Sequence, residues 1–240
     1  MWFFFVRHGQ TEDNVRGIIQ GQKDTPLNDY GRFEASRLAQ RLEKTKIIEA
    51  WSSPLSRARE TTEIVLKHHP QIPLQTADRL KERGLGSMEG RRRLKGEQAP
   101  EDAEEIAALT DRAQNWFDDF LAQHEPEAPL PTEHTFMPNP SNRQTFKRFK
   151  QDTDDLEIHL IISHGAWLNN LRRLLLSPRY GFKAAQHVDL HLPCLNTCIM
   201  VVECDYKDGR WRGIIQEWAN VEHLADVMYK EVKEIADDVQ

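Results

Sequence analysis

The sequence predicts an α/β fold with a mostly parallel central sheet and helices on both of its faces. Short apolar runs of strand length alternate along the chain with longer segments whose apolar residues recur at helical spacing. Strands separated by helices form a parallel sheet that is covered on both sides. Ligands of such sheets bind beyond the carboxyl ends of the strands. Two of the apolar runs lead directly into a His-Gly pair, so imidazoles are expected at that edge.

The individual elements follow from apolar spacing and from turn signals. The strands are the short apolar runs, expected at 2–6, 47–51, 158–162, 196–204 and 211–217, with a turn at 207–209. The helices carry an apolar stripe and are expected at 29–44, 102–123, 166–176 and 221–236. One more helix is expected to begin with Ser53 as its N-cap and Pro54 at its first position.

The whole chain, residues 1–240, is expected to form one domain. Residues 125–140 contain five prolines and few aliphatic residues, so they are interpreted as a loop. The apolar face of the C-terminal helix at 221–236 could pack on its own domain or on a second copy. A monomer and a homodimer are therefore both left open.

Composition narrows the partners and the compartment. A net charge of −6 and a pI of about 5.9 argue against a broad nucleic-acid surface. No apolar stretch approaches the ~20 residues that cross a bilayer, so no membrane partner is expected. Cys194, Cys198 and Cys204 are odd in number and lie in one segment, which indicates a reducing compartment, the cytoplasm. Cys194 and Cys198 have a spacing that zinc could use, but core cysteines are favoured because no second ligand pair is near.

Three segments place basic side chains at strand ends or at a helix start. Arg7 and His8 follow the first strand, His164 follows the strand at 158–162, and Arg57 lies in the first turn of a helix. Taken singly, such a histidine is usually structural and such an arginine is usually a surface charge. Two arginines and two imidazoles that converge on one point form an anion pocket, for which phosphate is the best fit.

The same residues lie in four motifs that resemble those of the phosphoglycerate mutase-like histidine phosphatases. The motifs occur in the expected order and span most of residues 2–203. The sequence departs from the common pattern at Gln10, where many relatives carry Glu. The matching segments are Arg7-His8-Gly9-Gln10-Thr11 with Asn14, continuing through Gln20-Gly21 to Gly31; residues 52–61; residues 79–90; and Ser163-His164-Gly165.

The resemblance implies a phosphoglycerate mutase-like fold and two-step phosphoryl transfer to and from a small phosphorylated substrate. His8 would be the nucleophile that becomes phosphohistidine, and Glu82 would be the general acid. Arg7, Arg57 and His164 would hold the phosphoryl oxygens. His164 would act best as a cation, its pKa raised by bound phosphate. Further substrate contacts would be Asn14, Gln20, Gly21, Arg83 and the N–H group of Gly165.

No metal and no other cofactor is expected, because the two arginines and two histidines supply the positive charge. Glu89 is the nearest rival of Glu82 as the acid, but a structural carboxylate bound to loop backbone is favoured there. The pair His68-His69 is interpreted as an exposed helix end rather than a metal site.

Phosphomonoester hydrolysis is the favoured activity, with three alternatives. A mutase must exclude water from the intermediate, and the short stretch after Gly90 indicates an open site. Residues 91–95 hold four basic side chains, which form either a solvated loop or a second anionic subsite. Because the loop at 125–140 could also cover the pocket, mutase activity stays open. The two remaining alternatives are a relative that binds an anionic ligand without catalysis and one that catalyses another reaction.

Overall fold

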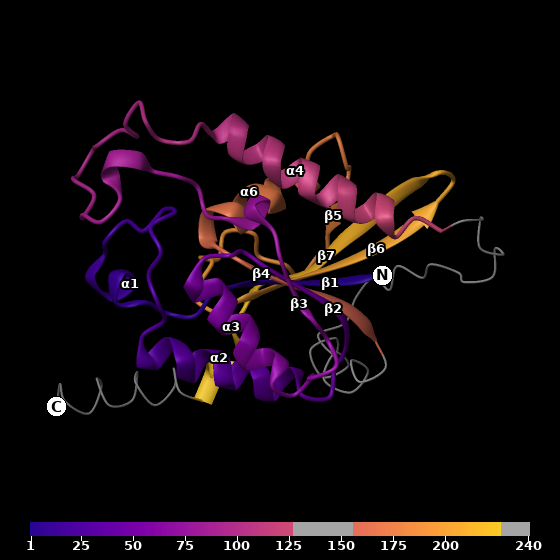
Figure 1. Cartoon of the computed structure of the whole chain (residues 1–240). Coiled ribbons are helices and arrows are strands. Elements are labelled where there is room, and N and C mark those ends of the chain that lie inside the picture. Colours follow the sequence, from indigo (N-terminus) through magenta and orange to yellow (C-terminus); the bar gives the residue numbers. More distant parts are fainter. Residues whose placement is uncertain (127–155, 227–240) are drawn as a thin grey trace.

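The computed structural model describes residues 1–126 and 156–226, and a seven-stranded sheet runs through its middle (Figure 1). Neighbouring strands follow the order β3-β2-β4-β1-β6-β7-β5. The strands are β1 (Trp2–Arg7), β2 (Lys46–Ser52), β3 (Leu74–Thr76), β4 (Glu157–Ser163), β5 (Lys183–Ala184), β6 (Ile199–Lys207) and β7 (Arg210–Asn220). The helices are α1 (Glu12–Arg16), α2 (Asp29–Leu42), α3 (Ser56–Leu66), α4 (Ile106–Gln123) and α6 (Gly165–Leu175), with short 3₁₀ turns η1 (Asp78–Leu80), η2 (Gly86–Met88) and η4 (Glu222–Leu224).

The sheet is mostly parallel, and this confirms the predicted fold class. β1 and β2 both pair in parallel with β4, β3 pairs in parallel with β2, and β5 with β7. Only the pairs β1–β6 and β6–β7 are antiparallel in the part of the chain described. Arg7 is the partner of Ser163 in the β1–β4 register, so the two His-Gly pairs follow strand ends that lie side by side.

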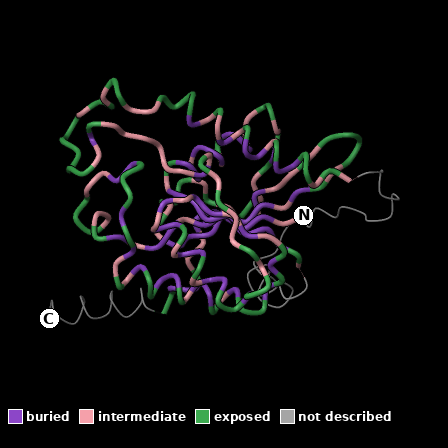
Figure 2. The backbone as a smooth tube through the Cα atoms, in the orientation of Figure 1, coloured by how far each residue is buried: buried purple, intermediate pink, exposed green. Residues whose placement is uncertain are grey.

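The central strand β1 explains why two layers of helix are needed. Phe3 and Phe5 point toward α4 and α6, whereas Phe4 and Val6 point toward α2 and α3. All four side chains are at most 3% exposed, and Figure 2 shows the sheet as the buried centre of the molecule. Burial of each such side chain stabilises the fold by roughly 1.5–3 kcal/mol. An apolar run without polar alternation therefore becomes a strand covered on both faces.

Three predicted element starts were wrong by two to four residues. Helix α3 begins at Ser56 with Leu55 as its N-cap, rather than at Pro54 with Ser53 as its N-cap. The backbone N–H of Ser53 instead donates to Ile162 O at 3.0 Å, so the chain still follows the sheet there. Helix α4 begins at Ile106 rather than at 102, because Asp102 binds Ser87. Strand β6 begins at Ile199 rather than at 196, after a left-handed residue at 197.

Only one histidine of the pair His68-His69 is exposed, although both were predicted to be. His68 is exposed, but His69 is 4% exposed and its Nε2 lies 3.0 Å from Leu42 O. The predicted core position holds for Cys198 and Cys204, which are buried, while Cys194 is half-buried.

Parts of two predictions lie outside the described residues. These are residues 127–140 of the proline-rich loop and residues 227–236 of the C-terminal helix. Residues 222–224 form the turn η4, which packs against α2. Among the helices at 1–126 and 156–226, none has the length and hydropathy needed to span a bilayer.

Candidate active site

A cavity of about 370 Å³ opens beyond the carboxyl ends of β1 and β4. Its wall contains eight of the ten residues that the sequence predicts for the site, namely Arg7, His8, Asn14, Gln20, Gly21, Arg57, Glu82 and Arg83. The other two lie directly beside it. The ring of His164 is 5.0 Å from that of His8, and Gly165 precedes the wall residue Ala166. The segments from four separate parts of the chain therefore meet at one point.

His8 is held with one nitrogen bound and the other facing a guanidinium. Its Nδ1 lies 2.7 Å from the carbonyl oxygen of Gly9, which can only accept, so Nδ1 carries the hydrogen. Nε2 therefore has a lone pair, and Arg57 Nε donates to it at 3.3 Å. Burial, and then Arg57 and Arg7, hold the pKa of His8 well below its ordinary value. His8 is thus a neutral imidazole with a directed Nε2 lone pair.

Arg57 is fixed by backbone carbonyls. Its Nη1 donates to Lys23 O at 2.9 Å and its Nη2 donates to Gly21 O at 2.8 Å. The side chain is 1% exposed, and burial lowers its pKa to about 10, so it stays charged near neutral pH. The glycine-containing loop at 20–23 therefore orients the guanidinium, because its carbonyls bind both terminal nitrogens.

Arg7 and His164 each present a buried nitrogen that has no partner among the described residues. Arg7 Nη1 donates to Cys194 O at 2.7 Å, whereas its Nε is unsatisfied. His164 Nε2 lies 2.8 Å from Ser53 Oγ, whereas its Nδ1 is unsatisfied. Since a buried unpaired polar atom costs ~1–3 kcal/mol, two of them at one cavity indicate a polar ligand.

The charge state of His164 in the ligand-free protein follows from its surroundings. The residue is 0% exposed and precedes helix α6 as its N-cap. Burial, and then Arg57, His8 and Arg7, hold the pKa of His164 well below its ordinary value. The expected cationic form therefore requires a bound anion that offsets these positive neighbours.

Glu82 is bound to the first turn of helix α6. Its Oε2 accepts from Ala166 N at 3.0 Å, and its Oε1 accepts from Trp167 N at 3.1 Å and from Arg83 N at 2.9 Å. The N–H groups of Ala166 and Trp167 have no partner within the helix, and the helix dipole favours a negative charge beside them. The same turn begins with Gly165, so the carboxylate is fixed to the helix that carries His164.

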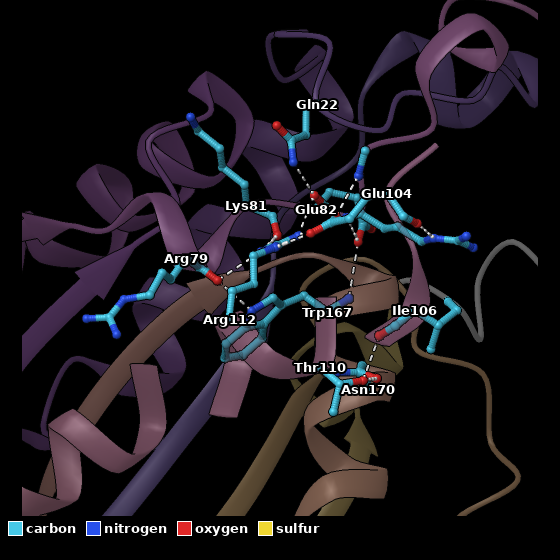
Figure 3. A network of polar contacts seen from close by, with 12 residues as sticks. Gln22, Arg79, Lys81, Glu82, Glu104, Ile106, Thr110, Arg112, Trp167 and Asn170 are labelled. Atoms are coloured by element: carbon cyan, nitrogen blue, oxygen red, sulfur yellow. Dashed lines mark hydrogen bonds and ion pairs between the residues drawn. The ribbon is translucent and has the colours of Figure 1, made fainter. Parts of the chain in front are cut away.

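Arg112 of α4 fixes the main chain that carries Glu82, and nothing in the sequence pattern singled it out (Figure 3). Its guanidinium donates to the carbonyl oxygens of Arg79, Lys81 and Glu82 at 2.9, 2.6 and 2.9 Å. Two further bonds, of 2.6 and 2.9 Å, bind both carboxylate oxygens of Glu104. All three guanidinium nitrogens are therefore engaged, and the acid-bearing segment is anchored to α4.

Glu89 binds loop backbone, as predicted. It accepts from the N–H groups of Gln22, Lys23 and Leu85 at 2.8–2.9 Å, and it therefore joins the loop at 20–23 to the acid-bearing segment. Gln10, the departure from the common motif, is not among the residues that line the cavity, and its side chain accepts from Asn28.

Comparison with known proteins gives the family that the four sequence motifs resemble. The model of the histidine phosphatase superfamily (branch 1) matches residues 3–137. A probable phosphatase of Schizosaccharomyces pombe is 36% identical over 50% of this chain and 61% of its own length, so the chain spans less than two thirds of that relative. A probable phosphoglycerate mutase of Proteus mirabilis is 29% identical over 96% of this chain and 98% of its own length.

The fold has solved counterparts. The structure of a mycobacterial glucosyl-3-phosphoglycerate phosphatase superposes with a TM-score of 0.67 at 22% identity, over 90% of this chain and 98% of that one. With the motifs in order and the superfamily model matching more than half of its residues, the chain belongs to the histidine phosphatase superfamily, branch 1.

Proposed function

We propose that the protein hydrolyses phosphomonoesters of small metabolites through a phosphohistidine on His8. The observation that carries this proposal is the His8 imidazole, neutral, with Nδ1 bound to Gly9 O and the Nε2 lone pair at the cavity wall. A histidine nucleophile needs this tautomer and this charge state. The family's named members are phosphatases and mutases, which is consistent with phosphoryl transfer.

In the first step His8 Nε2 attacks phosphorus in line with the leaving oxygen. The N–P bond forms as the P–O bond breaks. Glu82, which must enter this step in its protonated form, gives that proton to the departing alkoxide and is left as a carboxylate. In the second step water attacks the phosphohistidine and Glu82 takes up a proton from that water. The N–P bond breaks, inorganic phosphate leaves, and neutral His8 is restored.

The unsatisfied nitrogens define where the phosphoryl oxygens would lie. Arg7 Nε is a buried donor without a partner among the described residues, and His164 Nδ1 becomes a donor when the ring is cationic. Phosphoryl oxygens would satisfy both. Charge that spreads over the oxygens in the transition state strengthens both bonds. The geometry fits an oxyanion better than a neutral ester group, since Arg7 and Arg57 bring two positive charges to the cavity wall.

The preferred substrate in this proposal carries a second anionic group. Of the arginines near the cavity mouth, Arg83 and Arg93 line the wall beside Leu85, Met88 and Ala99. Arg91 is instead paired with Glu97 at 2.5 Å, and Arg92 donates to Arg16 O at 2.8 Å. Of the four basic residues at 91–95, only Arg93 lines the cavity, where Arg83 joins it. These two arginines next to an apolar wall suit a carboxylate or second phosphate on a short carbon chain.

The remaining expectations stay part of the proposal. We propose one domain, residues 1–240, that works in the cytoplasm without nucleic-acid or membrane partners and without a cofactor. Three free cysteines and the acidic pI support this compartment and this lack of partners. Monomer and homodimer both stay compatible with the described residues.

Phosphate release from a panel of substrates tests the proposal. The panel holds sugar phosphates, bisphosphates, phosphoglycerates, phosphoserine and an aryl phosphate, each with the wild type and with His8→Ala. We expect His8-dependent release, fastest for substrates with a second anionic group. Isomerisation of phosphoglycerate without phosphate release would favour the mutase, and binding of phosphate without turnover would favour a non-catalytic relative.

A further inference from the structure

Three potential metal ligands meet on the α4 side of the sheet, away from the cavity. Glu49 lies in β2, His159 in β4, and His124 is the C-cap of α4. Glu49 Oε2, His124 Nε2 and His159 Nδ1 all lie within 4.8 Å of one another. His159 is near the beginning of β4 and His164 follows its end, so about 16 Å of strand separates them.

The hydrogen bond of His124 Nδ1 leaves a lone pair on its Nε2, and this lone pair faces an oxygen of Glu49. Its Nδ1 lies 2.8 Å from the carbonyl oxygen of Phe120, which can only accept, so Nδ1 carries the hydrogen. Nε2 of the neutral ring then has a lone pair, and it lies 3.2 Å from Glu49 Oε2, which is also an acceptor. Two acceptors at this distance require a positive charge between them.

Two of the three distances between the ligand atoms match those of a tetrahedral metal centre. Glu49 Oε2 lies 3.2 Å from His124 Nε2 and 3.0 Å from His159 Nδ1. A tetrahedral ion with metal–ligand bonds of ~2.0–2.1 Å separates its ligands by about 3.3 Å. The third distance, between His124 Nε2 and His159 Nδ1, is at most 4.8 Å. The two imidazoles would therefore approach each other by at most about 1.5 Å to bind an ion.

Outer contacts orient these ligands in the way that metal ligands are usually oriented. Glu49 Oε1 accepts from Trp51 Nε1 at 2.8 Å and from Gln75 Nε2 at 3.0 Å, which leaves Oε2 for the ion. The bond from His124 Nδ1 to Phe120 O fixes its tautomer. Such second contacts are a regular part of protein metal sites.

We propose that Glu49, His124 and His159 bind a divalent transition metal ion such as Zn²⁺, with water as the fourth ligand. Two imidazoles and one carboxylate suit zinc rather than magnesium or calcium. The side chains are 18%, 27% and 4% exposed, so one side is open to water. The ion would join the end of α4 to β2 and β4, and its role is structural because the phosphate cavity lies beyond the opposite strand ends.

Zinc chloride titrated into metal-stripped full-length protein tests the site. We expect one ion per chain and a rise in Tm of about 5–10 °C at zinc a hundredfold above Kd. His124→Ala should weaken binding about 100-fold or more, since changes in outer contacts alone cost 10–100-fold. Exposed His191 supplies the matched control, and His191→Ala should bind as the wild type does.

Among the described residues, two other pairs of side chains have atoms that could bind zinc, and the experiment distinguishes them from the proposed site. Cys194 and Cys198 have their sulfurs 3.4 Å apart, and His8 faces His164. Cobalt bound at the proposed site should give visible d–d bands without the near-ultraviolet band of a thiolate ligand. Cys194→Ser and His8→Ala should both leave this spectrum unchanged.

Two results would overturn the inference. One is the absence of zinc binding by the wild type, which would make the cluster an ion pair of Glu49 with protonated His124. The other is binding that survives both His124→Ala and Glu49→Gln. Glu49→Gln retains an oxygen for Trp51 and Gln75, so it tests the site even if His124→Ala does not fold. Phosphate release should be unchanged in Glu49→Gln and in chelator, and this separates the inference from the proposed function.

Discussion

Nε of Arg57 donates to Nε2 of His8 across 3.3 Å, inside a buried pocket. The charge of the guanidinium disfavours a proton on Nε2, so the ring stays neutral, and the lone pair is free to attack once the Arg57 N–H turns to a phosphoryl oxygen. Because carbonyl oxygens of the loop at 20–23 bind both Nη atoms of Arg57, this contact is held without a substrate. The nucleophile is therefore preorganised, and the predictions below follow from its surroundings.

Glu82→Gln should slow hydrolysis according to the leaving group. Alkyl phosphates need a proton on the departing oxygen, so kcat should fall by about 10²–10⁴, whereas an aryl phosphate should lose much less. Steady-state kinetics with both substrate types measure the difference. The matched control is Glu89→Gln, which removes a structural carboxylate and should lower Tm without leaving-group dependence. Equal losses for both substrates in Glu82→Gln would exclude it as the acid.

Arg112→Lys should impair the positioning of Glu82. Lysine keeps the charge but cannot bind three carbonyl oxygens and both oxygens of Glu104 at once. We expect kcat for alkyl phosphates to fall about tenfold and KM to change little, with a smaller effect on aryl phosphates. Arg179→Lys, which alters an exposed pair with Asp118, should leave both constants unchanged. A loss of stability with no leaving-group dependence would reduce Arg112 to a structural role.

Phosphate binding should take up a proton on His164. Burial and nearby positive charge hold the pKa of His164 well below its ordinary value in the free protein. A phosphate dianion within hydrogen-bond reach favours the charged ring and raises that pKa. Calorimetric titration near pH 8 in buffers of different ionisation enthalpy measures the uptake. His164→Asn should remove it, and identical apparent enthalpies for the wild type in all buffers would contradict the prediction.

Stability should fall as the pH drops below about 6.5, and His223 should account for part of the fall. Burial, and then Arg41 and Arg37, lower the pKa of His223 to about 3 in the folded protein. The unfolded chain takes up a proton near pH 6.5 and the folded one does not, so this site alone costs about 1.4 kcal/mol per pH unit below that point. Urea unfolding from about pH 7.5 to 5 should show a shallower slope for His223→Gln. An unchanged slope would mean that His223 is protonated in the folded state.

The residues of the site could be predicted because they follow strand ends. Arg7, His8 and His164 each stand directly after a buried apolar run, and the parallel register of β1 and β4 joins those ends. Both the apolar runs and the motifs can be recognised locally, without knowledge of contacts between distant segments. The reading of Glu89 as a structural carboxylate was predictable for a related reason, because a short glycine-bearing loop leaves backbone N–H groups to be satisfied.

The supporting contacts could not be predicted, because they join segments with no local signal. Arg112 is one polar residue on an amphipathic helix, and its sequence context is that of a surface arginine. Ser53 resembled an N-cap, but its hydroxyl binds His164, which is 111 residues away. His69 lay in a polar context, and only the packing of α2 on α3 brings Leu42 O to its ring. Tertiary contacts decided all three cases.

The central claim is that His8 Nε2 becomes phosphorylated, and rapid quenching of the protein with a ³²P-labelled substrate tests it most directly. We expect label on the protein that is stable in alkali and lost in acid, that maps to the peptide containing His8, and that forms as fast as the first turnover. His8→Ala, with its fold verified by circular dichroism, should carry no label and release no phosphate. Phosphate release by the wild type without a labelled protein, or release that persists in His8→Ala, would contradict the account.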